Sequence, residues 1–246
     1  MAASVPVLAL FVAYERHKTR KDGSPLVELG LFRYRGVVGG LLIALLFFAG
    51  AGYSFVLTLH LQEGLGFSPL GAAMAFLPFS VGVVAGSGAA MQLVPRLGRR
   101  MVTGGGLVMA LGVALLVAAV QRYGEALQGW QLAPGMLVAG VGMAMVSTTL
   151  VTIVLARVPG RDAGSASGVV NTTLQIGLAA GIAAVGTLFF TLLDDGVGFV
   201  DATFRSLWLE IGLFLASALL SFLLPPGPVS TPGPGEAAAE ESPAAV

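Results

Sequence analysis

Residues 37–61 read VVGGLLIALLFFAGAGYSFVLTLHL and contain no Asp, Glu, Lys or Arg. At a rise of about 1.5 Å per residue, a helix of this length crosses the roughly 30 Å hydrocarbon core of a bilayer. Only two of the chain's charged residues, Arg205 and Glu210, lie within any of its long apolar runs. Five such runs follow the first one, at residues 70–93, 101–120, 131–155, 170–192 and 203–224. These runs predict an all-α polytopic membrane protein with six spanning helices.

The amino-acid composition agrees with a membrane protein and excludes several other classes. Hydrophobic residues make up 56% of the chain and charged residues 11%, whereas soluble domains carry roughly 25% charged residues. The 13 basic and 13 acidic residues balance, which excludes a strongly basic nucleic-acid-binding protein. The sequence contains no cysteine, so it can form no disulfide, Cys-ligated metal site or catalytic thiol.

No motif for catalysis, metal binding or cofactor binding occurs in the sequence. The two histidines, His17 and His60, are not spaced as metal ligands, and there is no Gly-x-Ser-x-Gly sequence. The glycines at 104–106 are not followed by Gly-Lys-Ser/Thr, so the chain lacks the phosphate-binding loop of an ATP-driven pump. We therefore expect no enzymatic activity, no catalytic residue, no cofactor and no bound metal.

The distribution of Lys and Arg predicts the orientation in the membrane. Eleven of the 13 basic side chains fall in three segments, 15–36, 94–100 and 156–169, which lie on one side if the six spans alternate. Because basic residues are enriched in cytoplasmic loops, we expect these segments and the C-terminus to be cytoplasmic. The protein is then a multi-pass protein of the cell (plasma) membrane.

The same patterns divide the chain into four parts. Residues 1–14 are apolar but too short for a comfortable span, and we expect a partial transmembrane helix there whose beginning is missing. Residues 15–36 form a cytoplasmic linker, and residues 37–224 form the six-helix bundle. Residues 225–246 are rich in proline and glycine, which predicts a disordered cytoplasmic tail.

Two ionisable residues within the spans allow more than one interpretation. Intramembrane acids such as Glu210 commonly mark proton or cation sites. The alternative is that Glu210 lies at a shallow depth and pairs with Arg205 or water. His60 stands at the outer end of the first span, where an interface residue is the more ordinary interpretation than a proton site.

The fifth span opens with amide side chains, Asn171 and Gln175. Amides within a bilayer need hydrogen-bonding partners, so we expect this pair to hold the span against its neighbours. Glycines four residues apart, Gly82 with Gly86 and Gly177 with Gly181, favour close helix packing.

Residues 92–100, QLVPRLGRR, resemble the loop signature Gly-x-x-x-Asp-Arg-x-Gly-Arg-Arg of major facilitator superfamily transporters. Met91 and Pro95 stand where the family has glycine and aspartate, so the charge latch normally formed by the aspartate is not reproduced. The resemblance implies a cytoplasmic gate loop made by Arg96, Gly98, Arg99 and Arg100.

Further stretches resemble the fourteen-helix drug:proton antiporters of that superfamily. Residues 25–35, PLVELGLFRYR, are similar to the segment before their C-terminal half, and residues 66–72, GFSPLGA, are similar to the next hairpin. The most specific match is AGSASG at 163–168 with the residues that follow it. Its members in this sequence are Gly164, Ser167, Gly168, Asn171 and Gln175.

The resemblance implies a six-helix C-terminal half of a proton-coupled exporter of hydrophobic drugs or metabolites. Its partners would be the lipid bilayer, a small amphipathic substrate, protons and a missing N-terminal half, without which we expect no transport. In such a half the second and fifth spans lie at the boundary with the other half, where the two glycine pairs would permit sliding. The sixth span would be peripheral, which argues against substrate contact by Glu210. The first and fourth spans would face the cavity, with Tyr53, Thr58, Met143 and Thr148 as candidate lining residues.

Three interpretations of the whole chain therefore remain at the level of sequence. The chain is the C-terminal half of an exporter with a truncated start, or a half-transporter subunit that assembles with a separate partner or with itself. The third interpretation is a non-transporting membrane scaffold or remnant.

Overall fold

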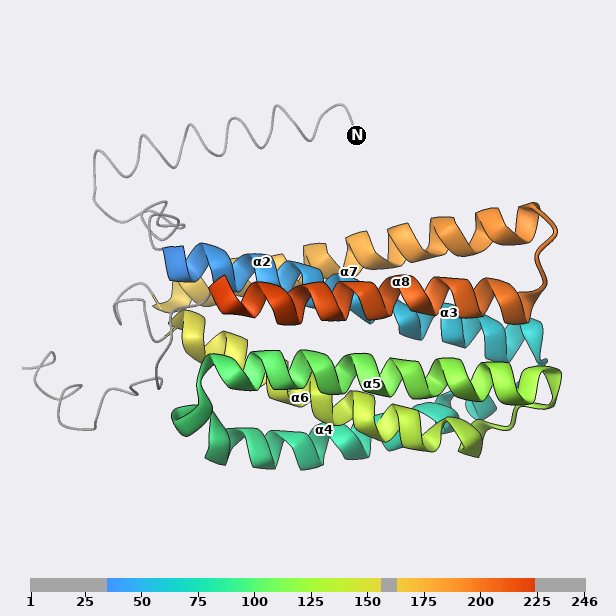
Figure 1. The fold of residues 1–246 in the computed structure, drawn as a ribbon, viewed down its shortest axis with the longest axis horizontal. Helices are drawn as coiled ribbons and strands as arrows, with labels where there is room; N and C mark the ends of the chain where they lie inside the picture. Colours follow the sequence, from blue (N-terminus) through green and yellow to red (C-terminus); the bar gives the residue numbers. More distant parts are fainter. Residues whose placement is uncertain (1–34, 156–162, 224–246) are drawn as a thin grey trace, which may run out of the picture.

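The computed structural model describes residues 35–155 and 163–223, and this part of the chain contains helices and turns but no strand. The expected partial helix at 1–14, all of the linker except its last two residues, and the tail at 225–246 lie outside the described residues. Six helical segments are long and apolar enough to cross a membrane, as the continuous apolar runs predicted. They lie roughly parallel in one elongated bundle (Figure 1).

The first span is one helix that contains two irregular turns. It comprises α2 (Arg35–Ala49), a 3₁₀ turn (Gly50–Gly52), α3 (Tyr53–Leu59) and a π-helical turn (His60–Gly64). The other spans are continuous α-helices. They are α4 (Pro69–Leu97), α5 (Arg99–Tyr123), α6 (Ala133–Leu155), α7 (Ala163–Asp194) and α8 (Phe199–Leu220). A 3₁₀ turn (Ser221–Leu223) follows α8, and two more (Gly124–Ala126 and Gly129–Leu132) connect α5 to α6.

The helix ends have local causes that can be read in the sequence. The Ser68 hydroxyl accepts a hydrogen bond of 3.1 Å from the Gly71 amide, and Pro69 occupies the first turn of α4, where proline loses no intrahelical bond. Gly98 has a positive φ of 49° and stands between α4 and α5. Only glycine adopts such a conformation without strain, so the chain reverses direction at this point.

The fifth span begins earlier than the sequence predicted. We expected residues 156–169 to be a loop and the span to start at 170, but α7 is helical from Ala163 onward. The Gly164–Gly168 part of the family-like motif is therefore on a helix. Runs of small residues are compatible with either state, and the neighbouring charged residues made this run look like a loop.

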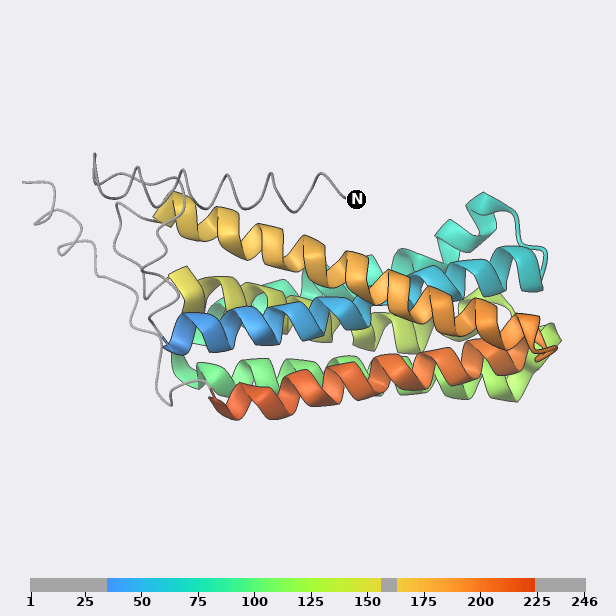
Figure 2. The same cartoon turned by 90° about the horizontal axis from the view of Figure 1, so that it is seen from above.

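The helices pack in a definite order across the bundle. The largest interfaces join α4 to α6, α6 to α5, α5 to α8, α8 to α2, and α2 to α7, and the two views in Figures 1 and 2 agree with this arrangement. Helices α4 and α7 thus stand at the two ends of the series. Only 22% of the 18-residue apolar stretch of α4 and 28% of that of α7 is buried, against 44–61% in the other four spans.

Close backbone contacts between helices are made through glycine. A methyl group built on Gly82 would overlap the Leu137 carbonyl of α6, and one built on Gly181 would overlap the Ala49 carbonyl of α2. Gly86 and Gly177 lie against the same two partner helices. The glycine pairs therefore join helices within this bundle. The expectation that they permit sliding at a boundary with another half is wrong. The glycine faces of α4 and α7 are covered by α6 and α2, so another half could pack only on the opposite faces of these helices.

Replacing Gly181 by alanine tests this contact. The added methyl group has no space against the Ala49 carbonyl, so α2 and α7 must separate. We expect Gly181→Ala to lower the free energy of unfolding by about 1–3 kcal/mol, the usual range for overpacking, measured by thermal unfolding in detergent. Gly168→Ala on the same helix is the matched control, since nothing lies within 4 Å of its Cβ position. Equal stability of the two variants would contradict the packing described here.

Candidate functional site

The most unusual polar feature of the bundle is the side chain of Glu210 on α8. It is completely buried, and neither carboxyl oxygen has a hydrogen-bond partner among the described residues. A methyl group built on Gly52 would lie 2.8 Å from Oε1 and 2.9 Å from a methyl carbon of Val185 on α7. The carboxyl group therefore lies against the backbone of the 3₁₀ turn in the first span, beside α7.

The structure does not support the shallow, ion-paired alternative for Glu210. Arg205 is exposed while Glu210 is buried, and the Glu210 oxygens make no bond to it. Five residues along an α-helix turn the chain by about 140°, so the two side chains leave α8 in different directions.

A second buried polar contact joins α8 to the first span about two turns from Glu210, toward the start of α8. His60 is completely buried, so its interpretation as an interface residue is wrong. Its Nδ1 lies 3.1 Å from the Thr203 hydroxyl, which is also completely buried. The other ring nitrogen, Nε2, has no partner among the described residues, and neither does the hydroxyl of Ser206.

These groups form a buried polar line along α8, defined here as Thr203, Ser206 and Glu210. The intervals of three and four residues place all three on one helical face. Farther along α8, buried Ser217 and Ser221 bond carbonyls of their own helix. The sequence analysis singled out Glu210 but missed Thr203, Ser206 and the opposing Gly52. The helical spacing of the small polar residues was the signal that would have found the first two.

The expected gate loop lies at the opposite end from His60. Arg96 is exposed in the last turn of α4, and Arg100 is exposed in the first turn of α5. Arg99 reaches the end of the last helix, where Nη1 lies 3.5 Å from the Phe222 carbonyl and the guanidinium lies 5.9 Å from the Phe222 ring centroid. A hydroxyl contact between Thr103 and Ser221 adds to this connection.

The predicted fifth-span motif lies on the uncovered side of α7. Gly164, Ser167 and Gly168 are exposed, and the Ser167 hydroxyl bonds only the Gly164 carbonyl of its own helix. Asn171 and Gln175 are exposed as well, and neither side chain has a hydrogen bond to the described residues. The expectation that these amides hold α7 against its neighbours in this bundle is therefore wrong.

The four residues expected to line a cavity are distributed among different environments. Tyr53 is buried, and its ring centroid lies 6.5 Å from that of Phe214. Thr58 is half-buried, and its hydroxyl donates to the Ser54 carbonyl at 2.7 Å. Met143 and Thr148 on α6 are also half-buried, and Met143 contacts the hydrophobic core.

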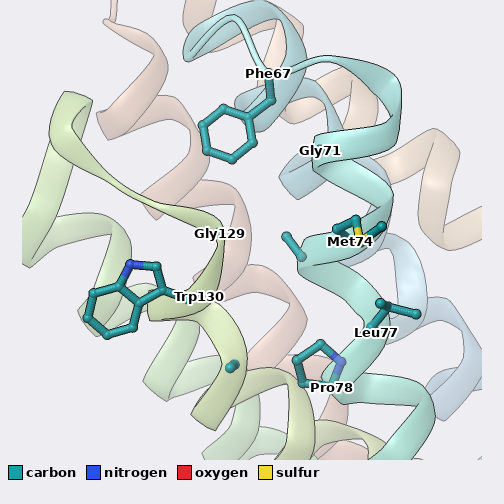
Figure 3. Close-up of a pocket in the computed structure, with 9 residues that line it drawn as sticks. Phe67, Gly71, Met74, Leu77, Pro78, Gly129 and Trp130 are labelled. Atoms are coloured by element: carbon teal, nitrogen blue, oxygen red, sulfur yellow. The ribbon is translucent and has the colours of Figure 1, made fainter.

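An apolar pocket of about 420 Å³ occurs elsewhere, between the first turns of α4 and the start of α6 (Figure 3). Phe67 and Trp130 stand on two sides of it, and Met74, Leu77 and Pro78 come from α4. The four expected cavity residues are not part of its lining. Its size and apolar walls suit the hydrophobic part of a small ligand.

Comparison with known proteins identifies the family. The sequence profile of the Major Facilitator Superfamily matches residues 1–182. The chain belongs to the major facilitator superfamily. This membership agrees with the six-helix bundle and with the loop that resembles the family signature.

Several relatives of this superfamily member are named as exporters or resistance proteins. It is 44% identical to the probable actinorhodin transporter of Streptomyces coelicolor, over 79% of this chain and 34% of the relative. It is 32% identical to the multidrug resistance protein Stp of Mycobacterium tuberculosis, over 76% of this chain and 33% of the relative. It is 33% identical to the cephamycin export protein CmcT of Amycolatopsis lactamdurans, over 94% of this chain and 47% of the relative. The matches thus span a third to a half of these relatives.

The His60–Thr203 contact is open to a direct test. Thr203→Val keeps the shape of the side chain but leaves the buried Nδ1 without its partner. We expect the variant to lose about 1–3 kcal/mol of stability, the penalty for an unsatisfied buried polar group. Thr187→Val on α7 is the control, because that hydroxyl is exposed and bonds only the Ala183 carbonyl of its own helix. If both variants unfold at the temperature of the parent protein, the contact does not stabilise the fold.

Proposed function

We propose that this chain forms the C-terminal half of a proton-coupled secondary exporter of hydrophobic drugs or metabolites, related to the fourteen-helix antiporters. The observation that carries the proposal is the uncovered state of α4 and α7, combined with the exposed amides on α7. In this proposal the protein lies in the plasma membrane, and the end of the bundle that carries Arg99 faces the cytoplasm.

The exposed amides support a partner on the α7 side. Asn171 and Gln175 lie within a span, where lipid offers no hydrogen bonds. Their side chains have no partner among the described residues, so a second set of helices is the natural source of one. Facilitators work by rocking two halves around a central site. An N-terminal half that packs on α4 and α7 would cover these two helices and would provide hydrogen-bond partners for the amides.

The proposed substrate class follows from the apolar pocket and from the named relatives. The pocket between α4 and α6 offers Phe67, Trp130 and Met74, which suit aromatic or aliphatic groups rather than charged ones. The relatives are named for actinorhodin, cephamycin and multidrug resistance. We assign the half-buried Thr58, Met143 and Thr148 to the cavity that forms when the second half is present, whereas Tyr53 is buried in the core of this bundle and is not assigned to it.

The contact of Arg99 with Phe222 supports a role of the gate loop in closing the cytoplasmic face. It ties the start of α5 to the end of α8, so that these two helices move together. Arg96 and Arg100 are exposed and available to the other half, where they would replace the latch that Pro95 cannot form.

Export measurements with and without an N-terminal half test the proposal. The chain is expressed alone, and also joined to the region that precedes the matched part of the actinorhodin transporter relative, in cells stripped of their efflux pumps. We expect only the joined form to lower the accumulation of an ethidium-like dye several-fold, and a proton uncoupler to abolish the effect.

The other outcomes of this experiment distinguish the alternatives. Export by the 246-residue chain alone would mean that a second copy supplies the missing half. Failure of both forms, with normal membrane insertion, would favour a non-transporting scaffold or remnant.

The position of the partner is a separate prediction. A photoreactive benzophenone side chain is introduced at Gln175 on α7, at Val84 on α4 or at Leu219 on α8, all of which are exposed. We expect the first two positions to cross-link to the N-terminal half, because they lie on the least covered helices, and the third to react with lipid. Equal cross-linking from Leu219 would show that the halves meet on another face.

A further inference from the structure

We propose that Glu210 is a proton-carrying site of this half, reached from the His60 end of the bundle along the polar line of α8. The role of the bound proton in driving export rests on the proposed function. The proton site itself depends only on the contacts of α8 with the first span.

Burial without a partner is the first observation. Both oxygens of Glu210 are buried and unbonded, although an isolated carboxylate is among the most costly groups to remove from water. Inside a bilayer such acids persist where they serve an ion or proton pathway. The neutral, protonated carboxyl is the form that these surroundings accept, and its ionised form requires contact with water.

Within the described residues, no Lys or Arg side chain is buried beside Glu210 to neutralise it permanently. From the first span it meets the Gly52 backbone, next to Tyr53, and Val185 and Gly181 of α7 lie against the same glycine. Among the described residues of the first span, the titratable groups are Tyr53, His60 and the exposed Glu63, and His60 contacts Thr203, about two turns from Glu210 along α8. Charged side chains of α5, α7 and α8 stand at helix ends or on exposed surfaces, namely Arg99, Arg100, Arg122, Asp194, Asp201 and Arg205.

The polar line runs from Glu210 toward the end of the bundle that carries His60, and in this proposal it is the route to the membrane surface. Thr203 is seven residues from Glu210, which is about 10 Å along the helix axis, and Ser206 stands between them. Thr203 contacts His60 at 3.1 Å, while the His60 Nε2 and the Ser206 hydroxyl have unused hydrogen-bonding capacity in the described part of the chain.

The irregular backbone of the first span opposite Glu210 is the second, independent observation. Gly52, in the 3₁₀ turn Gly50–Gly52, lies directly against the carboxyl, and a π-helical turn begins at His60. Both kinds of irregularity within a helix are frequent at functional sites and hinges. A change in this turn would expose Glu210 to one side of the membrane and then to the other.

The proton balance of the proposed step is simple. The Glu210 carboxylate takes one proton from water on the His60 side, and an Oε–H bond forms. The neutral carboxyl is then exposed to the opposite side, where the O–H bond breaks and the same proton enters water. One proton crosses for each cycle, in the direction opposite to the exported substrate.

The first test measures protonation without measuring transport. The 246-residue chain is reconstituted in lipid vesicles, and its infrared spectrum is recorded over a pH titration. We expect a protonated-carboxyl C=O band that titrates and is absent from Glu210→Gln but present in Glu125→Gln, in which the replaced acid is exposed. If Glu210→Gln fails to insert, Glu210→Asp is used, and a displaced band identifies the residue. No such band, or a band that never titrates, overturns the proposal.

The second test measures coupling in the joined exporter. Glu210→Gln resembles the permanently protonated side chain, so we expect at least a tenfold loss of uncoupler-sensitive uphill export with downhill dye equilibration retained. Glu210→Asp should restore part of the uphill export. Full uphill export by Glu210→Gln would show a structural role only and overturn the proposal.

The two tests separate this inference from the function proposed above. A titrating Glu210 band in a protein that exports nothing supports the proton site and contradicts the exporter. Normal export by the parent and by Glu210→Gln supports the exporter and contradicts the proton site.

Discussion

Close approach of helix backbones is the constraint on which the rest of this structure depends. Lipid is as apolar as a leucine side chain, so helices in a bilayer are joined by van der Waals packing rather than by removal of water. Gly82 allows α4 to lie on the backbone of α6, and Gly181 allows α2 to lie on α7. The second contact also fixes the turn at Gly50–Gly52 beside α8, where the missing side chain of Gly52 leaves space for Glu210 and that of Gly50 leaves space for the Phe214 ring.

The number and type of the helices could be predicted because the signal is local. An uninterrupted apolar run of spanning length has few alternatives in a membrane protein, and the positions of Ser68 and Gly98 mark helix ends by their own backbone chemistry. The helical start of α7 at Ala163 could not be predicted in this way. Its small residues form a helix or a loop according to their surroundings, which one sequence does not contain.

The candidate site was predicted less well, because it depends on which face of each helix is covered. The sequence identified Glu210 as an intramembrane acid, but whether it pairs with Arg205 depends on the rotation of α8 against its neighbours. His60 looked like an end residue because the apolar run stops beside it, yet the chain continues to Gly64 and α8 covers the ring. Asn171 and Gln175 were expected to face inward, and the packing of α7 through Gly177 and Gly181 turns them outward.

The burial of an acid in α8 also has a consequence for biosynthesis. With a mean hydropathy of 1.4, α8 has the least apolar stretch of the six spans, and a carboxylate at the centre of a helix opposes insertion by the translocon by about 2.5–3.5 kcal/mol. Because α2 and α5 precede α8 in the chain, they can already be in the bilayer when α8 is inserted, and their surfaces then replace lipid around Glu210. The order of the helices in the chain thus means that α8, the span that opposes insertion most, is made after the helices that it packs against.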